Sequence, residues 1–86
     1  MKPATPTDDV LSELGLLRRY ARSLTRDRDD AEDLVQDTLL RALERRASFR
    51  AGGNLRGWLL AILHNVFVDG RRARAAARAR EAAAAD

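Results

Sequence analysis

The chain has 86 residues and a formal net charge of +3, the size of one small domain or of a piece of a larger protein. It contains no cysteine and one histidine, which excludes disulfides, thiolate metal sites and cysteine nucleophiles and argues against His-rich metal or Ser-His-Asp sites. The longest uncharged apolar stretch, residues 58–68, is about half a membrane span, and the N-terminus lacks a signal-peptide core, so we expect a soluble, cytoplasmic, non-enzymatic protein without metal or cofactor.

The first segment, residues 1–8, contains two prolines and two threonines and no apolar anchor, which predicts disorder. Asp8 or Asp9 can cap the helix that follows, because a carboxylate accepts hydrogen bonds from the free N–H groups of a helix start. Apolar residues then recur at alternating steps of four and three, which predicts a helix that ends near Thr25. The residues of this apolar face are Val10, Leu14, Leu17, Ala21 and Leu24, flanked by Leu11 and Tyr20.

A second helix is predicted after the polar segment 25–30, with Asp29 or Asp30 as its cap. Glu32 and Asp33 fall in its first turn, where the helix dipole favours anions. These acids lack the spacing and central glycine of a calcium loop, so we interpret them as helix-start residues rather than a cation site. A broad apolar stripe predicts that the helix faces the core. Its members are Ala31, Leu34, Val35, Thr38, Leu39, Ala42 and Leu43.

A third helix is predicted after the Gly-Gly pair at positions 52–53, with Asn54 as its N-cap. This helix carries the most apolar stripe of the chain, which consists of Leu55, Trp58, Leu59, Ile62, Leu63, Val66 and Phe67. Because Trp58 shares that stripe, we predict that it is a core residue rather than a base-stacking platform.

The last segment, residues 71–86, is almost wholly alanine, arginine and glutamate, so it is helix-prone but has no large apolar residue to dock it. Gly70 can end or loosen the third helix just before it. The sequence therefore predicts an all-α fold: a compact three-helix bundle over residues 9–75, followed by a linker or frayed helix over residues 76–86.

Charge is distributed unevenly along the chain. Residues 1–40 contain 6 basic and 9 acidic residues, whereas residues 41–86 contain 10 basic and 4 acidic residues. Of the 16 basic residues 15 are arginine, whose planar guanidinium suits phosphates and base edges, although a genome rich in arginine codons is an alternative explanation. The acidic-to-basic polarity predicts two surfaces with different partners.

Polar residues outside the apolar stripes form two groups of candidate site residues. The first lies on the outer face of the second helix, which is either a solvated face or a docking surface with Leu40 as its apolar anchor. Its members are Asp33, Gln36, Asp37, Leu40 and Arg41. The second group is rich in arginine, which is either a solvated charge run or a phosphate-binding surface. Its members are Asn54, Arg56, His64, Asn65, Arg71, Arg72 and Arg74, with Arg78 and Arg80 beyond them.

Three features in a fixed order closely resemble region 2 of bacterial extracytoplasmic-function sigma factors. They are the segment DAEDLVQDTLLRAL at 30–43, the segment NLRGWLLAILHNVF at 54–67 after Phe49, and the pair Arg71-Arg72. The Phe-x-x-Gly-x-Asn-Leu-x-x-Trp-Leu spacing is most similar to the general-stress-response branch of alphaproteobacterial type. The resemblance covers about residues 10–75.

This resemblance implies a non-enzymatic helical domain with two binding surfaces. The second helix matches the segment that docks on the clamp helices of the RNA polymerase β′ subunit. The later segment matches the part that recognises and melts the promoter minus-ten element, where an unpaired base of the non-template strand is captured. The resemblance places the docking role on the first group of candidates and the DNA role on the second, with Asn65 the preferred base reader. We expect the two surfaces to lie on opposed faces of the bundle.

Sigma factors of this type also carry a C-terminal helix-turn-helix domain that reads the minus-thirty-five element, and these 86 residues contain no segment that matches it. We therefore expect an excised domain, or a truncated or mimic protein. The resemblance also implies an anti-sigma factor as a further partner. Two other readings stay open: a sigma-like decoy that binds an anti-sigma protein without DNA, and a basic helical protein that binds duplex DNA without affinity for β′. Salt-dependent binding to single-stranded minus-ten DNA separates the sigma-factor function from the decoy.

Overall fold

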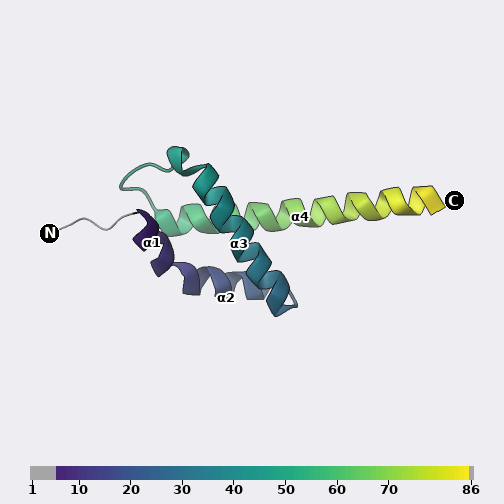
Figure 1. Cartoon of the computed structure of the whole chain (residues 1–86), viewed down its shortest axis with the longest axis horizontal. Helices are drawn as coiled ribbons and strands as arrows, with labels where there is room; N and C mark the ends of the chain where they lie inside the picture. The colour runs from purple at the N-terminus through teal and green to yellow at the C-terminus, as the bar shows by residue number, and fades with distance from the viewer. Residues whose placement is uncertain (1–5, 86) are drawn as a thin grey trace.

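The computed structural model describes residues 6–85, and all of its regular elements are helical (Figure 1). In chain order they are α1 (Pro6–Ser12), α2 (Leu14–Leu24), α3 (Arg28–Glu44), the 3-10 turn η1 (Arg46–Ser48) and α4 (Leu55–Ala85). The all-α prediction is confirmed. Residues 1–5 lie outside the described residues, and α1 begins at Pro6, before the predicted helix start.

The helix predicted to run unbroken to Thr25 is two helices, α1 and α2, that meet at Glu13. The Glu13 N–H bonds to the carbonyl of Val10, three residues back, at 3.0 Å, so the α-helical hydrogen-bond pattern is interrupted there. The Glu13 side chain is drawn inward toward α4, as described below. The prediction of a single first helix was therefore wrong at this position, although Leu17 and Ala21 of α2 are buried as expected.

The cap of α3 is Asp27 rather than the predicted Asp29 or Asp30. The backbone of Asp27 is extended, and its carboxylate accepts a hydrogen bond from the Asp29 N–H at 3.2 Å. Asp29 and Asp30 instead occupy the first turn of the helix, where their charges favour the positive end of its dipole. The helix thus begins two or three residues earlier than the polar pattern indicated.

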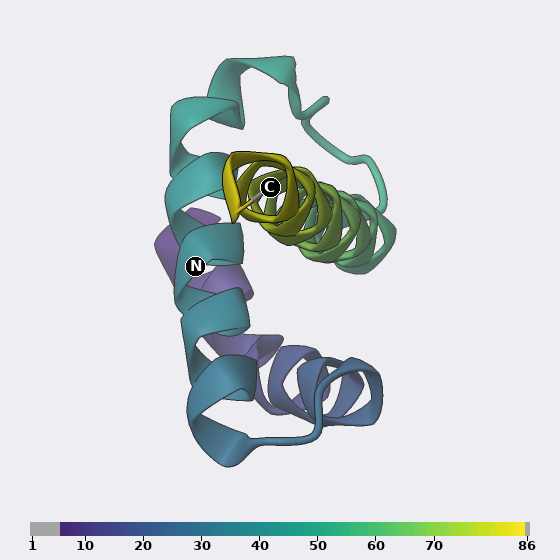
Figure 2. The ribbon, with the colours of Figure 1, turned by 90° about the vertical axis from the view of Figure 1, so that its right-hand side faces the viewer.

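The core forms where α3 crosses α4 and both pack on α2, as Figure 2 shows in a view along α4. Thr38 is the one buried polar residue in the described part of the chain, and its hydroxyl donates to the Leu34 carbonyl at 2.7 Å. The predicted stripes supply the core, with two exceptions: Leu11, at the flank of the first stripe, is 56% exposed and Leu43 is 60% exposed. The buried apolar residues are Leu17, Ala21, Ala31, Leu34, Val35, Ala42, Leu59, Ile62, Leu63 and Val66.

Helix α4 continues past Gly70 without a break and projects beyond the rest of the molecule (Figure 1). The molecule is therefore elongated, with extents of 66 × 26 × 15 Å. None of the residues 71–85 is buried, so this half of α4 depends on intrinsic helix propensity rather than on packing. Within residues 6–85, no helix has both the length and the apolar character that crossing a bilayer demands.

Candidate functional site

The outer face of α3 presents the first group of candidate residues to solvent. Asp33, Gln36 and Asp37 are exposed, and Leu40 is 59% exposed in their midst. Leu43 stands one turn further along and is equally exposed, although the sequence pattern assigned it to the core. The two leucines are three residues apart and therefore adjacent on the helix surface. An apolar pair surrounded by polar side chains is typical of a contact surface.

Arg41, the last residue of this group, points toward α4 rather than away from the bundle. Its guanidinium donates a hydrogen bond to the Asp69 carboxylate, with 3.1 Å between the nitrogen and the oxygen. Both side chains keep solvent access, so the pair contributes little to stability. It does join the candidate face of α3 to the middle of α4.

Asn54 and Arg56, which the sequence left free to face outward, both have partners within the domain. The Asn54 Oδ1 accepts a hydrogen bond from the Gly57 N–H at 3.0 Å, which confirms Asn54 as the cap of α4. Arg56 donates to the Glu13 carboxylate from Nε at 2.8 Å and, more weakly, from a terminal nitrogen at 3.5 Å. These hydrogen bonds and the nearby negative charge raise the pKa of Arg56. Glu13 was not predicted, because the sequence pattern indicated neither the helix break at which it lies nor its partner on α4.

The loop before α4 is fastened to the core through two aromatic side chains. Phe49 and Trp58 have ring centroids 5.1 Å apart at an angle of 46°. Both rings are half-buried, and Trp58 packs against the core cluster as predicted. The loop backbone turns tightly here, since the Gly53 N–H bonds to the Arg50 carbonyl at 2.9 Å. The start of α4 is therefore held by packing, by its cap and by the Arg56–Glu13 pair.

Along α4 the polar candidates divide between two sides. Asn65 and Arg72 are exposed and lie seven residues apart, about two helical turns, so they share one side. Phe67, Arg71 and Arg74 follow at steps of four and three on a different side, which begins about half a turn away from Asn65. His64 is exposed and lies in line with Arg71, about two turns before it.

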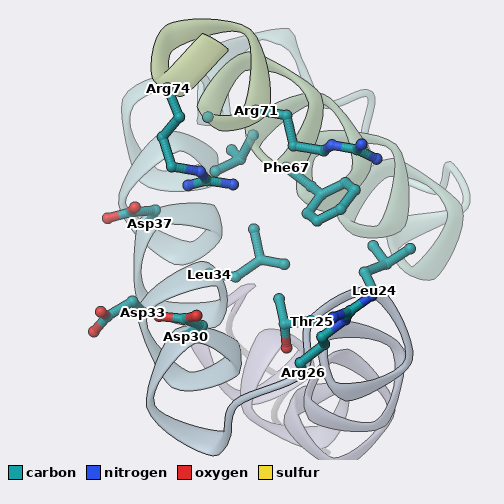
Figure 3. A pocket seen from close by; sticks show the side chains of 12 residues that line it. Leu24, Thr25, Arg26, Asp30, Asp33, Leu34, Asp37, Phe67, Arg71 and Arg74 are labelled. Atoms are coloured by element: carbon teal, nitrogen blue, oxygen red, sulfur yellow. The ribbon is translucent and has the colours of Figure 1, made fainter. Parts of the chain in front are cut away.

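An open groove of about 660 Å³ runs between α3 and the second side of α4 (Figure 3). Asp30, Asp33 and Asp37 line it from α3, and Arg71 and Arg74 line it from α4. Figure 3 shows Arg74 extending toward α3, whereas Arg71 points away from α3 beside Phe67. The Arg71 guanidinium carbon lies 5.7 Å from the centre of the Phe67 ring, a cation–π geometry. The remaining lining residues are Leu24, Thr25, Arg26, Leu34, Val66, Phe67 and Gly70.

This groove corrects the expectation that the two groups of candidates occupy opposed faces. Asp33 and Asp37 of the first group and Arg71 and Arg74 of the second line the same groove. Asn65 and Arg72, which also belong to the second group, lie on another side of α4. The reason is the crossing of α3 over α4, which turns one flank of α3 toward one side of α4. Among the described residues, no cluster of His, Asp and Glu is arranged to hold a metal ion.

Comparisons with known proteins agree on one family. The profile of the family described as Sigma-70 region 2 matches residues 10–77. The chain is 49% identical over 67 residues to the ECF RNA polymerase sigma factor EcfG of Rhodopseudomonas palustris, which covers 78% of this chain and 37% of that protein. It is 41% identical over 58 residues to the ECF RNA polymerase sigma factor SigL of Mycobacterium tuberculosis, covering 66% of this chain and 33% of that protein.

A solved structure is also similar to this chain. It is the sigma factor RpoE from Bartonella quintana, co-crystallised with the anti-sigma factor NepR, and it superposes with a TM-score of 0.74 at 46% sequence identity. The match covers 79% of this chain and 42% of that chain. This chain thus spans well under half the length of the relatives it matches.

Proposed function

The chain belongs to the Sigma-70 region 2 family, as region 2 of an ECF sigma factor, and on that premise we propose that it serves transcription initiation through two contacts. Helix α3 docks on the clamp helices of the RNA polymerase β′ subunit. Helix α4 recognises and opens the promoter minus-ten element on the non-template strand. Sigma factors are transcription regulators and not enzymes.

The observation that carries the proposal is the outer face of α3, where Leu40 and Leu43 are each about three-fifths exposed within a polar surround. Exposing both leucines has no use in folding, because neither contributes to the core. A partner helix that covers them would bury apolar area and would meet Asp33, Gln36 and Asp37 at the rim. An apolar centre with a polar rim is typical of a protein contact surface.

The docking role is tested with the double variant Asp37→Arg/Leu40→Ala in a pull-down of a β′ clamp-helix fragment. We expect clearly reduced recovery, because the variant reverses a rim charge and removes an apolar anchor. The matched control is Asp9→Arg/Leu11→Ala, which makes the same chemical changes at exposed residues of α1; Leu11 is 56% exposed. Equal recovery of the two variants would refute the docking face.

The DNA role rests on Asn65 and Arg72, which share an exposed side of α4 away from the core. An amide can both donate to and accept from a base edge, and a guanidinium can hold the adjacent phosphate. We expect Asn65→Ala to reduce run-off transcription by core polymerase while binding to the clamp-helix fragment is unchanged. Unchanged transcription would remove Asn65 from the DNA surface. His64, Arg71 and Arg74 are proposed as further phosphate or base contacts.

A second candidate function is that of a decoy that binds an anti-sigma factor without binding DNA. It is favoured by the structural neighbour, which was co-crystallised with the anti-sigma factor NepR. An anti-sigma partner is compatible with both functions, so its binding does not separate them. Salt-dependent binding of single-stranded minus-ten DNA does, because a decoy has no need for phosphate contacts.

A further inference from the structure

All five arginines of the first 40 residues lie within one short segment, although this half of the chain is acidic as a whole. They occupy positions 18, 19, 22, 26 and 28, and the same segment holds a single acid, Asp27. In the structure the segment forms the second half of α2 and the turn into α3. The acidic half of the chain therefore carries a local basic surface that belongs to neither of the two groups of candidate residues.

The fold pairs one of these arginines and leaves the other four without a carboxylate partner. Arg18 donates from Nε to the Glu32 carboxylate of α3 at 2.9 Å. The other four are exposed, and none of them takes part in an ion pair within the part of the chain that the structure describes. The Asp27 carboxylate accepts a hydrogen bond from the Asp29 N–H and so serves as the cap of α3. The positive charge of this surface is therefore not neutralised by direct pairing.

Three of the unpaired arginines surround an open hollow at the turn between α2 and α3. Arg22, Arg26 and Arg28, which we call the turn arginines, line it together with Thr25 and Asp27. The volume of the hollow is about 230 Å³, which is ample for a phosphate group. A guanidinium group presents a fork of N–H donors that matches the oxygens of a phosphate.

The hollow continues toward α4 through Arg26. This residue also lines the larger groove, in which Arg71 and Arg74 of α4 lie. Figure 3 shows Arg71 on the same side of that groove as Leu24 and Arg26, with the α3 carboxylates on the other side. A polyanion that binds the arginines of α4 can therefore extend along the surface to the turn arginines.

The segment has the chemistry to hold phosphates but not to read bases. Residues 18–28 contain no Asn or Gln. The hydroxyl groups of Ser23 and Thr25 donate to backbone carbonyls of α2, at 2.6 and 2.8 Å. The one aromatic residue, Tyr20, is half-buried against the core and is not a free platform for an unpaired base. These features favour the backbone of duplex DNA, which offers phosphates while its bases stay paired.

The segment also lacks the apolar centre of a protein contact surface. The core of a protein interface is depleted of charge and is formed by apolar and aromatic residues. The large apolar residues that the described part of the chain exposes are Leu11, Leu40 and Leu43, and none of them lies within residues 18–28. A surface formed by arginines alone is therefore better suited to a nucleic-acid backbone than to an acidic protein.

We propose that Arg22, Arg26 and Arg28 bind the phosphate backbone of duplex DNA next to the segment that α4 opens. The inference rests on the proposed function, because it takes α4 to be the helix that engages the promoter. The turn arginines add affinity without sequence preference, since a phosphate contact carries no base information. Each contact releases counterions from the DNA, so it contributes to the salt dependence of binding.

The test uses two variants that each remove two exposed arginines. The first is Arg22→Gln/Arg26→Gln, and the matched control is Arg45→Gln/Arg46→Gln, just after α3 and outside both hollows. Binding of a short fluorescein-labelled duplex is measured by anisotropy over a range of salt concentrations, and circular dichroism checks that each variant keeps its helices.

Each phosphate contact contributes about 0.9 to the slope of log K against log salt concentration. We therefore expect the slope to become shallower by about 1–2 in the first variant and by less than about 0.5 in the control. The charge-conserving variant Arg22→Lys/Arg26→Lys should retain most of the slope, because lysine also binds phosphate. Binding of an oligo(dT) strand should change less than binding of the duplex.

Equal slopes in the first variant and the control would overturn the inference and leave the DNA half of the proposed function intact, as long as the natural chain binds the duplex. If the natural chain binds neither the duplex nor the oligo(dT) strand, both fail together. An equal or larger loss on oligo(dT) would assign the turn arginines to the single strand instead. If the first variant binds duplex like the control but is recovered poorly by the β′ clamp-helix fragment, these arginines contact an acidic protein, which also overturns the inference.

Discussion

Asn54→Ala separates the two roles that Asn54 has been given, capping α4 and contacting DNA. In the structure its Oδ1 accepts from the Gly57 N–H at 3.0 Å, while its carbonyl accepts from the Trp58 N–H at 3.0 Å. Only the first of these bonds is lost in the alanine variant. Loss of an N-cap costs about 1 kcal/mol. In a domain of this size that cost lowers Tm by roughly 4–8 °C.

The assay is thermal and urea unfolding followed by helical circular dichroism, with Asn54→Ser as the matched variant. Serine also caps helices, so the serine variant should unfold close to the natural chain while the alanine variant unfolds earlier. Serine lacks the amide nitrogen, so any contact that this nitrogen makes with a base is lost in both variants. DNA binding measured beside stability therefore assigns each role separately.

The reasoning is refuted if Asn54→Ala melts with the natural chain. It would then follow that the cap contributes nothing and that α4 is held at its start by other contacts, such as the Phe49–Trp58 packing and the Arg56–Glu13 pair. Equal melting of the serine and alanine variants, both below the natural chain, would also contradict it, since serine would then have failed as a cap.

Other substitutions test the core and the exposed helices. Leu59→Ala removes a fully buried side chain and should lower the free energy of unfolding in urea by about 2–5 kcal/mol; a loss below about 1 kcal/mol would mean that the site collapses around the change. Gly15→Ala should raise Tm and add up to about 1 kcal/mol to the free energy of unfolding. Gly15 is helical and exposed, and an added Cβ meets nothing within 4 Å; an unchanged or lower Tm would contradict this. Deleting residues 78–86 should leave Tm unchanged but reduce the salt dependence of oligonucleotide binding, because Arg78 and Arg80 are lost; an unchanged salt slope would show that they do not contact phosphate.

The periodicity of apolar residues predicted most of the core, because a helix in a small bundle must turn its apolar stripe inward. It failed at Leu43, which lies on the outer face of α3 beside Leu40, although the neighbouring Ala42 is buried. Nothing in the local pattern distinguishes a leucine that a neighbouring helix covers from one that no helix covers. The same limit applies to Glu13, whose inward position depends on Arg56, a residue 43 positions away.

Cap positions were predicted to within a few residues for a related reason. Asp27, Asp29 and Asp30 are all suited to begin α3, and the sequence alone ranks them poorly. The extended backbone at Asp27 decides among them, and that conformation follows from how the chain leaves α2. Asn54, by contrast, has no rival cap beside it after the Gly-Gly pair, and its role was predicted correctly.

The arginine run shows why composition is a poor guide to a binding surface on a helix. Arg71, Arg72 and Arg74 are near neighbours in the sequence and look like one cluster, but the helix turns Arg72 to the side of Asn65 and turns the other two into the groove. Only the crossing of α3 over α4 then determines that Arg71 and Arg74 line a groove together with Asp33 and Asp37 and that Arg72 does not. Arg72→Gln should consequently weaken phosphate binding on the side of α4 that carries Asn65, and unchanged binding of single-stranded DNA by this variant would exclude that side from the DNA surface.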